Sequence, residues 1–383
     1  MWIIGQLGDA LAASGTMAWR IGWSLVLGFA LSAVVQAVVR REAVSQALGQ
    51  DDAATTLRAT GLGAAASSCS YAAVALARSL ITKGATFASA MVFQIASTNL
   101  VLELGIVMWL LLGWEFTLAE FVGGAVMIAF VALAFHWFVS DDAVRAAREQ
   151  ADKGIAGSME GHASMDMSVD TEGTVLQRLR SPKALTAIAH IFVMEWGAVL
   201  RDILLGLLVA GALQAWVPTS FWQGLFLTDS PFWSAVIGPV IAPAVGILSF
   251  VCSVGNVPLA GVLWNGGASF GGVMAFVFAD LLIVPILLIY RKYYGTAMML
   301  RILGIFYATM VLAAYVVEGL FALTGLTPEA RDAKVGAEGL SWNYTTWLDL
   351  LLGLLAALLV VRSFRNGGRE MLQHMGGEPA RQS

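Results

Sequence analysis

Two cysteines carry the most distinctive chemistry in this sequence. Cys69 and Cys252 are the only cysteines among 383 residues, and each is followed by a serine where small and polar residues interrupt an apolar stretch. A pair of thiolates can bind a soft metal or metalloid, or can exchange electrons by forming a disulfide. A buried cysteine can equally be an inert residue that fills space. Because the two Cys-Ser pairs match, we favour binding and predict a substrate site made of Cys69, Ser70, Cys252, Ser253 and Asn256.

Several polar or ionisable side chains lie within apolar stretches, where a charge is costly and usually has a function. The predicted proton-coupling or cavity-lining residues are Asn99, Glu103, Glu195, Arg201, Asp202 and Asp280. Asn99 and Glu103 are four residues apart, which places them on one face if a single helix contains both. The alternative for Arg201 is a structural ion pair with Asp202 or Asp280. No resident metal and no cofactor is expected, because two cysteines cannot form a zinc finger.

The elements that hold these residues are expected to lie in a membrane. Apolar residues make up 58% of the chain and charged residues 13%, whereas a soluble domain carries about a quarter charged residues. The net charge of −4 gives no reason to expect nucleic acid as a partner. A helix needs about 20 apolar residues to cross a bilayer core of ~30 Å. The stretches that meet this need are 16–39, 85–112, 117–139, 186–214, 268–290, 298–322 and 344–364.

Two further apolar stretches, 60–82 and 236–264, are broken by the polar residues around the two cysteines. Such breaks are tolerated in lipid only where protein or a water-filled cavity covers the freed backbone groups. We therefore predict two re-entrant helical elements, although each could instead be a pair of short helices. The predicted fold class is an all-α polytopic membrane protein with about seven full spans and two broken elements.

The sequence repeats itself at an offset of 183 positions. Between Cys69 and Leu104, 14 of 36 residues are identical to those 183 positions later, and the two cysteines superimpose. Three full crossings in each half predict that the second half is an inverted copy of the first, as in many secondary transporters. Arg78 and Lys83 mark the first broken element as cytoplasmic. Their uncharged counterparts at 261 and 266 fit an element on the opposite side.

The distribution of Lys and Arg predicts an orientation in a bacterial inner membrane. With the N-terminus outside and the C-terminus inside, eighteen Lys and Arg residues fall on the inner side, and only Arg331 and Lys334 fall outside. The predicted divisions are a first transmembrane repeat, a cytoplasmic linker, a second repeat, an outer loop with an extra span, and a cytoplasmic tail. Their ranges are 1–139, 140–183, 184–322, 323–365 and 366–383. The start of the linker, from Asp141, is expected to form a short helix.

The Cys-Ser break followed by KGATFASAMVF, and its repeat followed by GGASFGGVMAF, resembles the predicted-permease family that includes the organoarsenical efflux permeases (ArsP). The resemblance implies a polytopic inner-membrane protein that exports trivalent organoarsenicals such as methylarsenite, with Cys69 and Cys252 at the motif cysteines. The family's first element often reads Cys-Ser-Cys with a proline nearby, whereas this chain has Ser67 and Ala75 at those places. Two thiols match the two exchangeable ligands of a monomethylated As(III).

The predicted function is a secondary-active permease that exports a small thiophilic solute by alternating access, with the proton gradient as the energy source. It is not expected to be an enzyme, and no nucleotide-binding motif is visible. Its expected partners are a small-molecule or metalloid substrate and the lipid bilayer. The sequence does not decide whether the protein forms a homo-oligomer. The alternatives are a membrane thiol oxidoreductase that uses the two cysteines, and a channel or scaffold subunit in which they are inert.

Overall fold

The computed structural model is helical, and the residues it describes contain no strand. The described ranges are 2–38, 47–50, 52–67, 70–82, 84–152, 181–227, 230–249, 253–334 and 344–369. The helices of the first half are α1 (Trp2–Val38), α3 (Ala53–Ala66), α4 (Ser70–Thr82), α5 (Phe87–Asn99), α6 (Leu102–Leu111), α7 (Trp114–Phe138) and α8 (Asp141–Asp152). Those that follow are α11 (Pro182–Trp216), α12 (Thr219–Leu225), α13 (Pro231–Ser249), α14 (Ser253–Asn265), α15 (Phe270–Phe278), η1 (Ala279–Leu281), α16 (Val284–Tyr294), α17 (Thr296–Thr324) and α18 (Tyr344–Arg365).

Several of these helices are long and apolar enough to cross a membrane. Among the described residues, five candidates meet that test, and a sixth is added if the bent pair formed by 270–281 and 284–294 is one span. The five are Phe87–Leu111, Trp114–Phe138, Pro231–Leu248, Thr296–Thr324 and Thr346–Arg365. The chain is therefore a multi-pass membrane protein, while the number of seven full spans stays a prediction. Pro231–Leu248 belongs to a stretch predicted to be broken, and is long enough to span alone.

The first broken stretch divides into α3 and α4, and the second into α13 and α14. Asn256 and Pro258 lie inside α14, so they do not interrupt the second stretch as the sequence predicts. A proline beyond the first turn removes one backbone hydrogen bond and can bend a helix, and α14 continues past it to Asn265.

The helix boundaries recur at the offset seen in the sequence. α4 begins at Ser70 and α14 begins 183 positions later at Ser253, and their last residues are also 183 positions apart. The turns that follow contain Gly84 with a φ of 107° and Gly267 with a φ of 108°. A side chain strongly disfavours this backbone conformation, and glycine accepts it.

The close helix crossings recur as well. In α3, a Cβ atom added at Gly63 would lie 2.4 Å from the carbonyl oxygen of Phe93 and 2.9 Å from the Cβ of Ala96. In α13, a Cβ atom added at Gly246 would lie 2.8 Å from the Cβ of Ala279. These contacts are separated by the same 183 positions. Small residues let helix backbones approach closely in a membrane, and here they bring each outer half-helix against α5 or α15.

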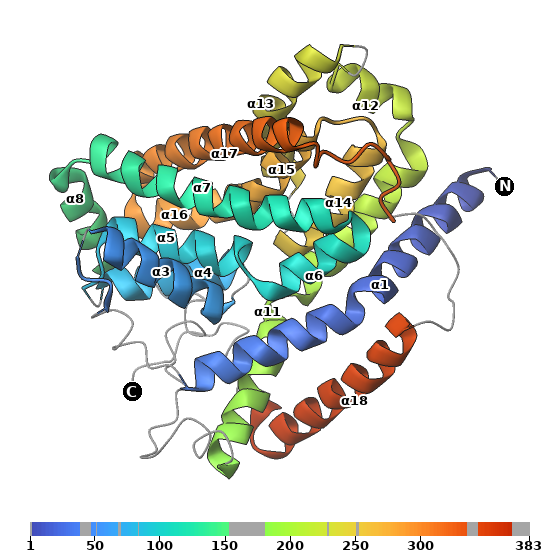
Figure 1. The fold of residues 1–383 in the computed structure, drawn as a ribbon. Coiled ribbons are helices and arrows are strands. Elements are labelled where there is room, and N and C mark those ends of the chain that lie inside the picture. The colour runs from blue at the N-terminus through green and yellow to red at the C-terminus, as the bar shows by residue number, and fades with distance from the viewer. Residues whose placement is uncertain are drawn as a thin grey trace.

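Repeat-related helices pack in antiparallel pairs. Ser14 of α1 donates to the carbonyl of Leu207 in α11 at 2.9 Å, and Trp216 near the end of α11 donates to the carbonyl of Gln6. The end of α11 therefore lies beside the beginning of α1. In the same way, the aromatic rings of Phe135 in α7 and Phe306 in α17 are in contact. Figure 1 shows α7 and α17 side by side along one face of the molecule.

Two helices are additions to this paired arrangement. α18 packs against α1 and α11, and only 6% of its apolar window is buried within the protein. It lies at the edge of the molecule in Figure 1.

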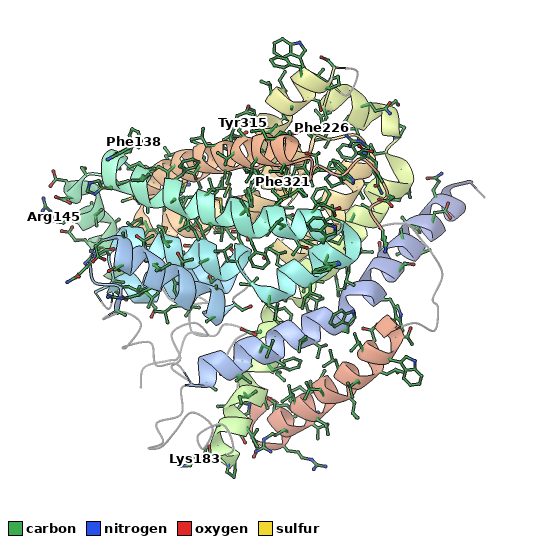
Figure 2. The ribbon with its side chains drawn as sticks, viewed as in Figure 1. Phe138, Arg145, Lys183, Phe226, Tyr315 and Phe321 are labelled. Atoms are coloured by element: carbon green, nitrogen blue, oxygen red, sulfur yellow. The ribbon has the colours of Figure 1, made fainter. Side chains whose placement is uncertain are left out.

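α8 confirms the helix expected at the start of the linker. It docks on the rest of the protein through Arg78, which donates to the carbonyl of Ala151 at 2.7 Å. Figure 2 shows Arg145 of α8 and Lys183 of α11 at the periphery.

Candidate functional site

The first residues of the two inner half-helices meet at one carboxyl group. Ser70, which begins α4, donates its hydroxyl to Oδ2 of Asp280 at 2.9 Å. The hydroxyl of Ser253, which begins α14, also lies near the Asp280 carboxyl group. All three residues are buried. The helices that follow the two Cys-Ser breaks therefore converge on one point. Their N-terminal ends carry the positive end of the helix dipole, which favours a negative group between them.

A third helix end lies at the same point. Asp280 belongs to the short 3₁₀ turn η1, after which the chain bends by 42° before α16. The hydroxyl of Thr98, in the last turn of α5, lies near its carboxyl group. Because α5 and α15 are related by the repeat, this polar point lies between corresponding parts of the two halves.

Glu120 of α7 is a member of this buried group that is absent from the residues predicted from the sequence. It is fully buried, accepts a hydrogen bond from Nδ2 of Asn99 at 3.2 Å, and interacts electrostatically with Asp280. A signal for it exists, because it lies within the predicted span 117–139 and an ionisable residue inside a span is a functional candidate.

Asn99 and Glu103 do not share a helix face, which corrects the sequence prediction. α5 ends at Asn99, Val101 has an extended backbone, and Glu103 belongs to α6. The physical reason is the polar run before the break. Ser97 and Thr98 donate their hydroxyls to carbonyl groups three residues earlier, and such bonds compete with continuation of a helix.

Glu103 of α6 contacts the end of α3, next to the first interruption. It accepts a hydrogen bond from the hydroxyl of Ser67, which follows α3 with a left-handed backbone conformation. Glu103 also packs against Gly28 of α1, where an added Cβ would lie 2.4 Å from the Cβ of Glu103. The described contacts connect Glu103 to α1 and α3 rather than to Asp280.

The structure places some of the other predicted site residues and does not describe the rest. Asn256 is fully buried one turn into α14, and Glu195 is buried in α11. Cys69 and Cys252 lie outside the described residues, as do the side chains of Arg201 and Asp202. Their roles stay predictions.

A second buried hydrogen bond connects the halves near Asp280. Gln94 of α5 donates its amide to the hydroxyl of Tyr290 in α16. The interior thus contains carboxyl, hydroxyl and amide groups that come from both halves. Such a set can hold a proton or a cation, or can line a path for a polar solute.

Two arginines hold the turns at the tips of the helical hairpins. Arg148 of α8 donates to the carbonyl of Ala85, and Arg331, which follows α17, donates to the carbonyl of Ala268, both at 2.8 Å. The donors are 183 positions apart, and so are the acceptors. The two arginines lie beyond the segment aligned from the sequence, which ends at Leu104 and its counterpart. Arg331 also stacks on the ring of Trp264 at 4.3 Å.

Comparison with known proteins identifies the family of this chain. A family model described as "Predicted permease" matches residues 6–319. This chain belongs to that permease family. A protein of Mycobacterium tuberculosis (strain ATCC 25618 / H37Rv) named "Putative permease Rv2963" is 62% identical over 377 residues, which cover 98% of this chain and 93% of that protein. No solved structure matches the permease. The family resemblance read from the Cys-Ser breaks is confirmed.

Proposed function

We propose that this permease is a secondary-active exporter of a small thiophilic solute, with a trivalent organoarsenical as the preferred candidate. The observation that carries the proposal is the convergence of Ser70 and Ser253 on Asp280. Cys69 and Cys252 directly precede these serines in the sequence. We infer that both thiols belong to one site. Two thiolates can replace the two exchangeable ligands of a monomethylated As(III), and soft sulfur ligands suit a soft centre.

We further propose that the two halves form an inverted repeat that gives alternating access. Three observations support this idea. Helix boundaries and close crossings recur 183 positions apart, α1 runs antiparallel to α11, and α7 runs antiparallel to α17. Contacts between the halves are also reciprocal, since α14 packs against α6 while α4 packs against α16. A two-fold relation between similar units produces this reciprocity. Rocking of one half against the other would then open the site to each side in turn.

The energy source we propose is the proton gradient, with Asp280 and Glu103 as the first carboxyl groups to test. A buried carboxyl group can take up and release a proton as access alternates. If Asp280→Asn and Glu103→Gln both leave proton-driven transport intact, this coupling is wrong. The proposed orientation, with the N-terminus outside the inner membrane and the C-terminus inside, follows from the positive charges.

The test of the function is export of methylarsenite in an arsenic-sensitive bacterial host and in everted vesicles, with arsenite, antimonite and copper in the same screen. We expect the wild type to export methylarsenite, and Cys69→Ser and Cys252→Ser each to abolish export at equal protein level in the membrane. Gly61→Ala is the matched control, because a Cβ at Gly61 meets no atom within 4 Å. Export that survives both cysteine changes would contradict the thiol site.

The same variants separate the alternatives. A membrane thiol oxidoreductase would form and break a disulfide during turnover, and would lose both with either cysteine change. A channel or scaffold subunit with inert thiols would keep its conductance or its assembly in both variants.

A further inference from the structure

We propose that Glu120 and Asp280 together form the site that binds the coupling proton, and that the pair holds one proton, on Oε2 of Glu120 or on Oδ1 of Asp280. This inference rests on the proposed function for its role in transport. The site itself is a property of the protein that can be measured without any substrate.

The hydrogen bonds leave one oxygen of each carboxyl group available. Oε1 of Glu120 accepts the bond from Asn99, and Oδ2 of Asp280 accepts the bond from Ser70. The other two oxygens, Oε2 of Glu120 and Oδ1 of Asp280, are buried and have no hydrogen-bond partner among the described residues. A buried polar atom without a partner is rare and costly. Each of these oxygens is therefore a place where a proton can bind, and binding there removes the cost of a buried negative charge.

The charges around the pair favour a single proton. Both carboxyl groups are fully buried, and within the described part of the chain neither forms a salt bridge with an Arg, Lys or His side chain. Two interacting negative charges in a low-dielectric interior destabilise each other, so one proton on the pair is the stable state. Among the described residues, Tyr290 is a further titratable neighbour, which interacts electrostatically with Asp280 and bonds to Gln94. The thiols of Cys69 and Cys252 directly precede Ser70 and Ser253 in the sequence.

Asn99 is oriented as a positioning residue for Glu120. Its Oδ1 accepts a hydrogen bond from the hydroxyl of Thr98 at 3.1 Å, which directs its Nδ2 toward Glu120. The run Ser97-Thr98-Asn99 thus ends α5 and also holds the carboxyl group of α7.

Two glycines explain why Glu120 lies close to both halves. A Cβ atom at Gly123 would lie 2.5 Å from Phe278, the last residue of α15, and one at Gly124 would lie 2.6 Å from Leu100, which follows α5. The missing side chains let α7 contact the ends of both helices, one turn away from Glu120. A relative movement of the halves would therefore change the surroundings of this proton.

The experiment is infrared difference spectroscopy of the purified full-length permease in lipid nanodiscs, between acidic and alkaline buffers. A protonated carboxyl group has a carbonyl stretch separate from the amide bands. We expect such a band in the wild type, and we expect Glu120→Gln and Asp280→Asn each to remove or shift it. Glu115→Gln is the control on the same helix and is expected to leave the band unchanged. A band that neither Glu120→Gln nor Asp280→Asn alters would overturn the proposal.

Asn99→Ala keeps the test decisive if those variants do not fold, because it removes the donor to Glu120 while leaving both carboxyl groups in place, and it should shift the band. A wild-type spectrum that responds to Na⁺ at constant pH, with the response lost in both carboxyl variants, would make the pair a sodium site and would also overturn the proposal. In vesicles, Glu120→Gln should keep substrate exchange and lose accumulation driven by the proton gradient. If the wild type exports no thiophilic solute, the proposed function fails while the infrared result stands by itself.

Discussion

Ser70 and Ser253 occupy equivalent positions in the repeat, and both lie at the carboxyl group of Asp280. Ser70 donates to Oδ2 of Asp280 at 2.9 Å. The two halves share this one carboxyl group rather than having one each, since the residue equivalent to Asp280 is Ser97. At the scale of single residues, the site is therefore asymmetric even though the helices around it repeat.

Ser70→Ala tests the importance of this hydrogen bond. Loss of a donor to a buried carboxyl group is expected to cost about 1–3 kcal/mol. We expect a lower thermal unfolding temperature in detergent and slower export. Ser79→Ala, on the same helix and only partly buried, is the control. Equal behaviour of the two variants would show that Ser70 does not hold Asp280.

Asp52 gives a pH dependence outside the membrane. It caps the start of α3. The nearby hydroxyl of Thr55 and the backbone N–H of Thr55, which donates to Oδ1 at 2.7 Å, lower the pKa of Asp52 below its usual value of 3.8. The stabilisation of α3 is therefore present above the unfolded pKa of Asp52 and is lost as the pH falls through the folded one. We expect faster amide exchange of Thr55, relative to its intrinsic rate, in acid and in Asp52→Ala at neutral pH. Exchange that is unchanged in Asp52→Ala would contradict the role of this cap.

At the scale of helices, the crossing of α3 and α5 sets how closely the first broken element approaches the site. A Cβ at Gly63 would lie 2.4 Å from a backbone carbonyl oxygen, which cannot move without displacing α5. We expect Gly63→Ala to destabilise the protein by about 1–3 kcal/mol through overpacking. Gly61→Ala in the same helix meets no atom within 4 Å and is expected to be neutral or slightly stabilising. Thermal unfolding in detergent measures both, and equal stability of the two variants would refute this account.

The two arginines at the hairpin tips provide another prediction for the helices. Arg148 holds the turn before α5 and Arg331 holds the turn before α15. We expect Arg148→Ala and Arg331→Ala each to increase amide exchange in its own turn and to slow export. The effect of Arg331→Ala should be larger, because this side chain also bonds to the carbonyl of Trp264 and stacks on its ring. Arg145→Ala, at an exposed position on α8, is the control. Local exchange that is unchanged in both tip variants would remove these arginines from the proposed role.

Sequence reasoning located the first interruption well, since a cluster of small and polar residues within an apolar stretch has a direct effect on backbone hydrogen bonding. It extended the second interruption too far, because Asn256 and Pro258 lie inside α14. It placed Asn99 and Glu103 wrongly, because the break after Asn99 depends on side-chain bonds that spacing does not show. It also missed Glu120, whose significance comes from its contact with residues of other helices. Contacts between distant segments are set by packing, and a periodic pattern in one segment does not contain them.

At the scale of the whole molecule, the antiparallel packing of repeat-related helices predicts that equivalent loops lie on opposite sides of the membrane. Arg145 of α8 and Glu329, after α17, are both exposed and occupy nearly equivalent positions in the two halves. In a background with Cys69→Ser and Cys252→Ser, we expect Arg145→Cys to react with a membrane-impermeant thiol reagent only after the cells are opened. Glu329→Cys should react in intact cells. Because the two positions differ by 184 residues, a label that reached both from the same side would mean that the halves are not inverted. Alternating access about a site between the ends of α4 and α14 would then lose its structural basis.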